Sequence, residues 1–192
     1  TDAAGNLVSD TYTWTKANGS GTANLNVDKL TGAISGTVLI TATSVANPAK
    51  SGGQTVQVIP GALSIVTVSG DTNITSAVET TSYTATSTDA AGNFIPDTHT
   101  WSNANGTGTA TRNIDKLTGV LSGTVTITAT SQLVPAKAGS KTVTVIPGAV
   151  NTVTASGPDP IASGIESSSY TATSTDAAGN LVSDTYTWTK AN

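Results

Sequence analysis

The sequence predicts an all-β fold built from repeated modules. Threonine, a β-branched residue that favours strands, alternates with apolar residues in stretches such as residues 124–129 (TVTITA). Glycine and asparagine interrupt these stretches at short intervals, as turns require. Charged residues make up only 10% of the chain, and because Leu, Glu, Lys, Arg and Gln are scarce we expect almost no helix.

A strict internal repeat organises the chain. The string TDAAGN begins at Thr1, Thr88 and Thr175, so the period is 88 − 1 = 175 − 88 = 87 residues. Residues 175–192 repeat residues 1–18 letter for letter. A fixed period of this kind indicates an array of similar structural units.

Proline-glycine pairs mark where the units begin. Pro cannot donate a hydrogen bond to a sheet and Gly frees the following turn, so Pro60-Gly61 and Pro147-Gly148 are the natural boundaries. We expect a complete module at residues 61–147, the middle segment. Residues 1–60, the first segment, are the C-terminal part of a module whose first strands are missing. Residues 148–192, the last segment, are the N-terminal part of the next module.

The alternation of apolar and polar residues predicts strands in the middle segment at residues 63–69, 82–88, 98–103, 109–115, 120–131 and 141–146. Turns are expected at residues 89–93 (DAAGN) and 116–119 (KLTG). About seven strands in 87 residues fit a two-sheet sandwich. The residues predicted to lie in its core are Trp14, Trp101, Trp188, Tyr83, Val125, Ile127 and Val143, with Ile114 and Leu121 also facing inward.

Three motifs carry a family resemblance. Residues 101–105 (WSNAN), 115–119 (DKLTG) and 123–131 (GTVTITATS) resemble bacterial Ig-like domains of the group 2 type, while the DAAGN hairpin is similar to group 1 and large-adhesin modules. The resemblance implies tandem Ig-like β-sandwich modules of a bacterial or archaeal surface protein. It also implies a role as spacer or binding tip in adhesins, stalks, filaments or S-layers.

Composition excludes several functional classes. The net charge is −4 and the eight basic residues are scattered, so no nucleic-acid partner is expected. No apolar run of about 20 residues is present, so no membrane insertion is expected in this segment. The absence of Cys favours an extracellular, cell-surface location.

No catalytic motif is present either. The one histidine, His99, takes a position that Tyr12 and Tyr186 hold in the other repeats, and neither G-x-S-x-G nor H-E-x-x-H occurs. We therefore predict neither an enzyme nor a cofactor.

Two kinds of candidate site remain. Carboxylate and amide oxygens at a spacing that suits a calcium ion occur at Asp2, Asn6, Asp10, Asp89, Asn93 and Asp97. A role in forming the turn explains these residues better, so no metal is predicted. Glycosylation sequons stand at Asn18, Asn73 and Asn105.

The function expected from these observations is structural. Repeated modules would act as a spacer or load-bearing rod of an extracellular fibre, stalk or filament, since length grows with copy number. Charged residues, which would keep edge strands from pairing with other chains, are scarce. We therefore expect neighbouring copies of the repeat as partners, through lateral assembly or strand exchange. The alternative is an adhesin module that binds a host protein or a glycan through its loops, although aromatic residues are only 4% of the chain.

Overall fold

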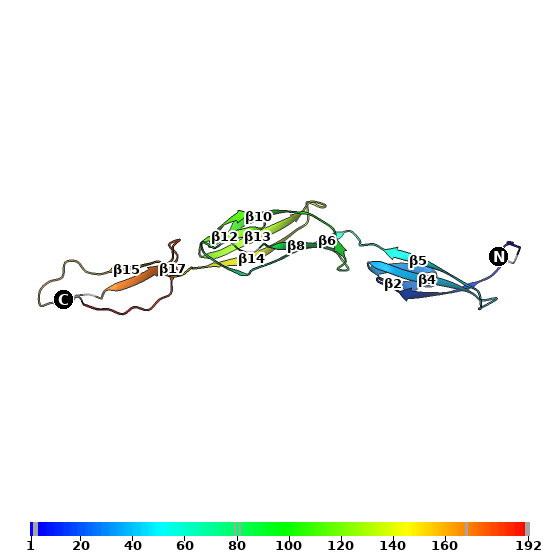
Figure 1. Cartoon of the computed structure of the whole chain (residues 1–192), viewed down its shortest axis with the longest axis horizontal. Coiled ribbons are helices and arrows are strands. Elements are labelled where there is room, and N and C mark those ends of the chain that lie inside the picture. The colour runs from blue at the N-terminus through cyan, green and yellow to red at the C-terminus, as the bar shows by residue number, and fades with distance from the viewer. Residues whose placement is uncertain (2–3, 79, 81, 168, 191–192) are drawn as a thin grey trace. The chain divides into compact units, whose positions relative to one another are not determined.

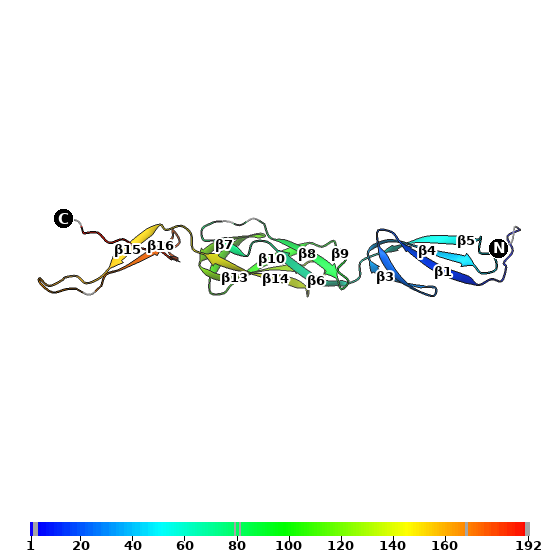
Figure 2. The same ribbon diagram turned by 90° about the horizontal axis from the view of Figure 1, so that it is seen from below.

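A computed structural model describes residues 1, 4–78, 80, 82–167 and 169–190. Every regular element among these residues is a β-strand (Figures 1 and 2), which confirms the all-β prediction. None of the described residues forms a helix long and apolar enough to cross a membrane. The chain divides into two compact units, Thr1–Ile65 with Ser87–Pro96, and Val66–Thr86 with Asp97–Asn192.

The first segment contains a three-stranded antiparallel sheet of order β1-β4-β5 and a separate hairpin, β2-β3. Trp14 on β1 lies opposite Ala42 on β4, and Ala42 lies opposite Gly52 on β5. The strands are β1 (Tyr12–Asn18), β2 (Thr22–Asn26), β3 (Lys29–Ile34), β4 (Gly36–Ser44) and β5 (Ser51–Val58).

The middle segment repeats this arrangement and adds strands to it. β10-β13-β14 carries the register of β1-β4-β5, with Trp101 opposite Ala129 and Ala129 opposite Gly139. The short β7 extends this sheet by pairing parallel to β14, and β6-β8-β9 form a further sheet. The strands are β6 (Leu63–Ser69), β7 (Asn73–Thr75), β8 (Thr84–Asp89), β9 (Phe94–Ile95), β10 (His99–Asn105), β11 (Thr109–Asn113), β12 (Lys116–Leu121), β13 (Gly123–Ser131) and β14 (Ala138–Ile146).

The last segment holds one three-stranded sheet, β15-β16-β17. Its strands β15 (Thr152–Ser156) and β16 (Thr171–Thr175) pair antiparallel, and β17 (Leu181–Val182) pairs with the end of β16. These strands are the counterparts of β6, β8 and β9, 87 residues earlier in the chain.

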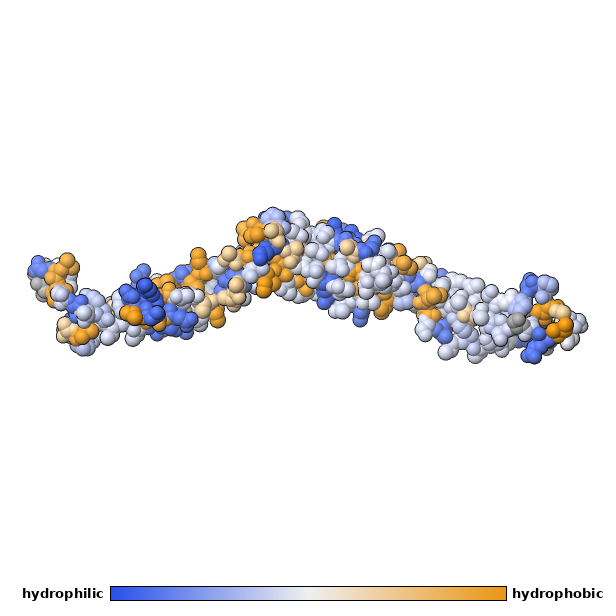
Figure 3. Space-filling model, turned by 180° about the vertical axis from the view of Figure 1, so that it is seen from behind, coloured by the Kyte–Doolittle hydropathy of each residue, from blue (hydrophilic) through white to orange (hydrophobic). Residues whose placement is uncertain are grey.

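The core follows the two-residue period of the strands. Along β13, Val125, Ile127 and Ala129 are buried while the threonines between them are partly exposed. Tyr83 and Val143 are buried as well. On the face shown in Figure 3, much of the surface is of intermediate hydropathy, interrupted by apolar patches (orange), as expected for a chain whose solvent-facing strand positions are largely threonine and serine.

Two of the tryptophans do not lie where the sequence places them. Trp14 is 37% exposed and Trp188 is 57% exposed, whereas Trp101 is partly buried. Trp188 lies outside the strands, so no sheet holds its ring. Trp14 does pair with β4, but the β1-β4-β5 sheet is much less covered than its counterpart in the middle segment.

The turn between β11 and β12 also differs from the prediction. The chain reverses at Ile114, which has a φ of 53° and is 72% exposed, so the prediction that it faces inward is wrong. Residues 116–119, predicted as a turn, form the start of β12 instead. The strand predicted at residues 120–131 is broken between β12 and β13, where Gly123 has a φ of +133°. Leu121, predicted to face inward, lies at this break and is 47% exposed.

Candidate functional site at the two DAAGN loops

The loop of residues 89–93 is held in shape by its first side chain. Asp89 Oδ1 accepts hydrogen bonds from the backbone N–H groups of Ala91 at 2.9 Å and Asn93 at 2.8 Å. Gly92 adopts a φ of +85°, which other residues rarely tolerate. An Asp followed by Gly-Asn therefore specifies a tight turn, as the sequence predicts.

The same loop binds the preceding repeat. Asn93 Oδ1 accepts the N–H of Ser35 at 2.8 Å, and Asn93 Nδ2 donates to the carbonyl of Ala33 at 3.0 Å. Asp89 Oδ2 accepts the N–H of Gly61 at 2.8 Å and the Asn93 amide at 2.8 Å. The two side chains thus join the loop to the β3–β4 connection and to the Pro-Gly boundary, and we call this set of residues (33–35, 61 and 89–93) the first loop site.

The second loop site, residues 120–122, 148 and 176–180, repeats these bonds 87 residues later. Asn180 accepts the N–H of Ser122 at 2.7 Å and donates to the carbonyl of Val120 at 2.9 Å. Asp176 accepts the N–H of Gly148 at 2.8 Å. Asp89, Asn93, Asp176 and Asn180 are all at least 93% buried, so these bonds are shielded from water.

One serine strengthens the second loop site. Ser76, which is buried, donates its hydroxyl to Asp176 Oδ2 and accepts the N–H of Gly148 at 3.0 Å. Its own N–H donates to the carbonyl of Ile146 at 2.9 Å. In the first loop site the position equivalent to that of Ser76 is a hollow of about 410 Å³, and Asp89 and Asn93 are among the residues that line it.

The hydrogen bonds stabilise the charged form of both aspartates. The Asn93 side chain and the N–H of Gly61 lower the pKa of Asp89 from its ordinary 3.8 to about 2. The pKa of Asp176 is lowered further, first by the Ser76 hydroxyl and then by the N–H of Gly148. Neutral donors therefore offset the effect of burial and keep both carboxylates ionised to a lower pH than an ordinary aspartate.

Asp10 and Asp97, which the sequence also proposes as calcium candidates, do not join the loop sites. Asp10 accepts the N–H groups of Thr11 and Ala46 at 2.8 and 3.2 Å, and Asp97 accepts the N–H of Leu133 at 3.2 Å and lies 3.5 Å from His99 Nε2. Within the described ranges no three His, Cys, Asp or Glu side chains gather to hold a metal ion. Asn6 is exposed, and Asp2 lies outside the described residues.

The three asparagines of the sequons are all exposed. Asn18 and Asn105 end equivalent strands, β1 and β10, and Asn73 begins β7. Asn18 accepts a hydrogen bond from Lys16 Nζ at 2.9 Å, and Asn105 accepts the N–H of Ala110 at 3.1 Å. Glycosylation of these residues stays a prediction.

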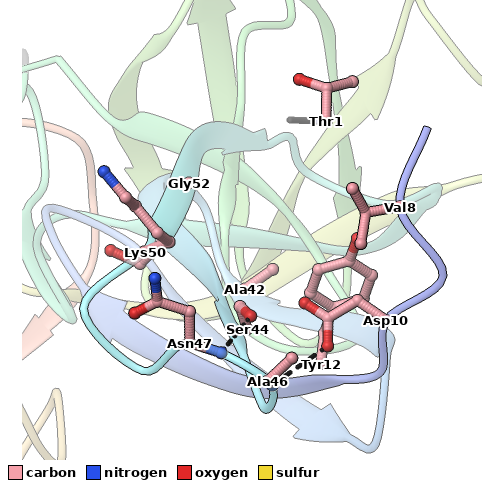
Figure 4. A pocket seen from close by; sticks show the side chains of 11 residues that line it. Thr1, Val8, Asp10, Tyr12, Ala42, Ser44, Ala46, Asn47, Lys50 and Gly52 are labelled. Carbon is pink, nitrogen blue, oxygen red and sulfur yellow. Dashed lines mark hydrogen bonds between the residues drawn. The ribbon is translucent and has the colours of Figure 1, made fainter. Parts of the chain in front are cut away.

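A larger hollow of about 720 Å³ lies over the ends of β1, β4 and β5 (Figure 4). The side chains of Tyr12, Ala42 and Ser44 line it together with the backbone of Gly52. Asp10 stands at one side, where its carboxylate binds the N–H of Ala46. Most of its lining residues are small and uncharged, and the charged side chains of Asp10 and Lys50 complete it.

Sequence reasoning found the DAAGN turn but not the contacts that its side chains make with the preceding repeat. Asn93 lies 58 residues from Ser35 and 60 from Ala33. The only signal in the sequence was the recurrence of Asp and Asn, four residues apart, at the same distance after each Pro-Gly pair.

No model of a known protein family matches the sequence, and no curated protein matches it. Among solved structures, the chain is similar to a protein described as FdeC, a broadly conserved Escherichia coli adhesin, with 20% identity and a TM-score of 0.49 over 90% of this chain and 64% of that one. It is also similar to domains 4–9 of the surface layer protein SbsC, with 22% identity and a TM-score of 0.35 over 96% of this chain and 31% of that one. The chain therefore spans less than two thirds of each of these proteins.

Proposed function

We propose that this chain is a structural part of an extracellular surface fibre or stalk, in which each 87-residue repeat is an Ig-like β-sandwich that adds length. In this proposal the DAAGN loops fix each repeat to the one before it. The observation that carries the proposal is the recurrence of the same buried hydrogen bonds at the two loop sites, 87 residues apart.

The nature of these contacts supports a spacer. A flexible linker makes no such contacts, whereas an Asn side chain bound to both an N–H and a carbonyl holds its loop against the strand end that it contacts. Each loop site also binds the Gly of the Pro-Gly boundary, Gly61 or Gly148. The boundary glycine and the DAAGN loop that follows it in the chain thus become parts of one hydrogen-bonded unit.

Composition supports the extracellular setting. The chain has no Cys or Met, and its solvent-facing strand positions are largely threonine. Such a surface stays hydrated with few charges, so repeats can accumulate without strong mutual repulsion.

A distance measurement across the second loop site tests the proposal. Spin labels at Ser102→Cys and Thr171→Cys, both exposed positions on either side of the site, are specific because the chain has no other cysteine. Electron-electron double resonance should give a narrow distance distribution in the full chain. Asn180→Ala should broaden it, because the bonds to Ser122 and Val120 are lost.

The matched control is Asn151→Ala, an exposed asparagine of the same unit whose side chain, among the described residues, donates a hydrogen bond to its neighbour Thr152. It should leave the distribution unchanged. An equally broad distribution with and without Asn180 would remove the basis for a spacer. Saturable binding of the chain on a glycan array would favour the recognition module instead.

A further inference from the structure

The strand β10 is a long edge strand of the middle segment. Its sheet has the order β10-β13-β14-β7, and among the described residues no strand other than β13 pairs with β10. At the opposite edge β7 has only three residues, whereas β10 has seven. A long edge strand presents a row of backbone groups to which another chain can add a strand.

The pairing of β10 with β13 determines which backbone groups lie at this edge. The N–H of Gly106, just after β10, donates to the carbonyl of Thr124 at 2.9 Å. In an antiparallel pair every second residue bonds to the partner strand, and the residues between them direct their N–H and C=O groups to the other side. The even-numbered residues of β10 therefore face β13, and Trp101 and Asn103 direct their backbone groups toward the edge.

Residues 99–105 carry none of the features that usually protect an edge strand. The sequence of β10, HTWSNAN, has no Lys, Arg, Asp, Glu or Pro, and its register with β13 is continuous, without a bulge. Charged side chains, prolines and bulges are what keep edge strands from pairing with other chains. A second strand laid against β10 meets small, uncharged side chains on its exposed face, namely Thr100, Ser102 and Ala104.

The other two repeats carry a lysine at the position of Asn103. Lys16 and Lys190 stand 87 residues before and after it. Lys16 is half-buried on β1, the edge strand of the order β1-β4-β5, and its Nζ donates to Asn18 at 2.9 Å. A charge at this place resists strand pairing, because a partner strand would take the ammonium group out of water. The middle repeat lacks this protection.

We propose that β10 binds a second copy of this chain by antiparallel pairing of the two β10 strands. Centred on Ser102, the middle of the strand, the pairing places Trp101 of each copy opposite Asn103 of the other and forms four backbone hydrogen bonds between them. The two sheets then become one. The partner is a second copy because the edge is neutral and self-complementary: a two-fold axis lets each strand supply the donors and acceptors that the other needs.

The size of this contact predicts weak association. Seven residues a side are fewer than the roughly 20–30 of a stable interface, so we expect a dissociation constant of about 0.1 mM. Such a contact leaves dilute chains separate and joins chains that already lie side by side. The proposal goes beyond the proposed function by naming a partner and its edge, and it uses none of the DAAGN contacts.

Sedimentation equilibrium of the full chain tests the proposal. Between about 1 µM and about 1 mM the average mass should rise from that of one chain toward that of two. Asn103→Lys should weaken association at least about tenfold, because it brings a charge to the paired edge. Its circular dichroism should be unchanged, since two repeats carry Lys at this position. The control Thr142→Lys adds the same charge at an exposed position of β14, two strands from the edge, and should associate like the unchanged chain.

Cysteine cross-linking tests the register of the two strands. Thr100 of one copy lies opposite Ala104 of the other in a non-hydrogen-bonded pair, where Cα atoms are about 4.5 Å apart and a disulfide can form. Under mild oxidation a mixture of the Thr100→Cys and Ala104→Cys variants should yield the mixed dimer, identified by its mass, in excess of either homodimer. The chain has no other cysteine, and this test leaves Asn103 in place, so it decides the question even if Asn103→Lys fails to fold.

Each contrary result has a definite meaning. A chain that stays monomeric at about 1 mM overturns the proposal. So does a folded Asn103→Lys variant that associates like the unchanged chain, or a cysteine mixture that gives no excess of the mixed dimer. The distance distribution across the second loop site, measured in the Asn103→Lys background, reports on single chains. Failure of the edge contact is thus distinguishable from failure of the spacer function.

Discussion

Asn180→Ala should loosen the second loop site far more than an ordinary surface substitution does. The Asn180 side chain is 2% exposed and makes three hydrogen bonds, to the N–H of Ser122, the carbonyl of Val120 and the carboxylate of Asp176. Alanine fills less space and makes none of them. Two backbone groups, the carbonyl of Val120 near the end of β12 and the N–H of Ser122 just after it, would then lose their partner.

The magnitude follows from the bonds that are lost. A buried donor or acceptor left without a partner costs about 1–3 kcal/mol, and water entering the vacated space recovers part of this. With two such groups, and the loss of one donor to Asp176, we expect local opening to become easier by about 3 kcal/mol. Amide exchange at Ser122 should then accelerate by roughly a hundredfold.

Native-state hydrogen exchange, resolved by residue with NMR, is the assay. The control Asn151→Ala should change the free energy of opening by less than about 0.5 kcal/mol. Asn180→Asp keeps an acceptor for Ser122 but loses the amide donor and places a second carboxylate beside Asp176, so it should open at least as easily at neutral pH. Unchanged protection of Ser122 in Asn180→Ala would refute the role given to this side chain.

Three further predictions concern other parts of the fold. Because the pKa of Asp89 is lowered to about 2, the stability that its carboxylate contributes is complete above about pH 4 and is lost as the pH falls toward 2. Hydrogen exchange should show the protection of the Gly61 amide decreasing over this range. Ile114→Asn should raise the free energy of unfolding by about 1 kcal/mol in urea titrations, because Asn tolerates a φ of 53° better than a β-branched residue, and an unchanged midpoint would contradict this. Leu117→Ala should destabilise its hairpin by about 3 kcal/mol, and Leu30→Ala, at a half-buried position, should destabilise the equivalent hairpin by clearly less. Thermal unfolding of dilute samples measures both losses. Equal losses would show that the residues packed over the β11–β12 hairpin, Thr80 and Tyr83 among them, contribute nothing.

The sequence predicts the strands where alternation is strict. Residues 63–69 form β6 over the predicted range, and the Val-Thr-Ile-Thr-Ala run lies in β13 with its apolar residues inward. Local pattern suffices there because burial on one side of a sheet imposes the two-residue period directly.

Local pattern fails where the backbone departs from ordinary geometry. Ile114 and its counterpart Val27 occupy left-handed positions, with φ of 53° and 56°, although β-branched residues disfavour them. The sequence predicts the turn at residues 116–119 (KLTG) instead, because of its Gly, and therefore predicts that Ile114 lies in the core. The reversal occurs earlier because β11 and β12 pair continuously from Ala110–Gly119 to Asn113–Lys116.

The DAAGN loops could be predicted as turns, but their partners could not. The Asp that shapes the loop also accepts the N–H of Gly61, and the Asn that ends it reaches Ala33 and Ser35. No local period encodes a contact between residues about 60 positions apart. The oxygens that made these residues calcium candidates are occupied by N–H donors, and only the fold shows this.

The chemistry of the loop sites also explains how neighbouring repeats can differ in sequence and keep the same connection. Both asparagines recognise only backbone groups of the preceding repeat, and a backbone N–H and carbonyl are present whatever side chain the residue carries. Ala33 in the first site is replaced by Val120 in the second, yet the carbonyl accepts the amide at 3.0 Å in one and 2.9 Å in the other. The Asp, the Asn and the loop's positive-φ Gly are common to both sites, where they supply the shared side-chain partners and the special backbone angle, whereas the Ser76 hydroxyl belongs to the second site. A repeat array connected in this way can vary its strand surfaces, including those that meet other molecules, without altering how one repeat is joined to the next.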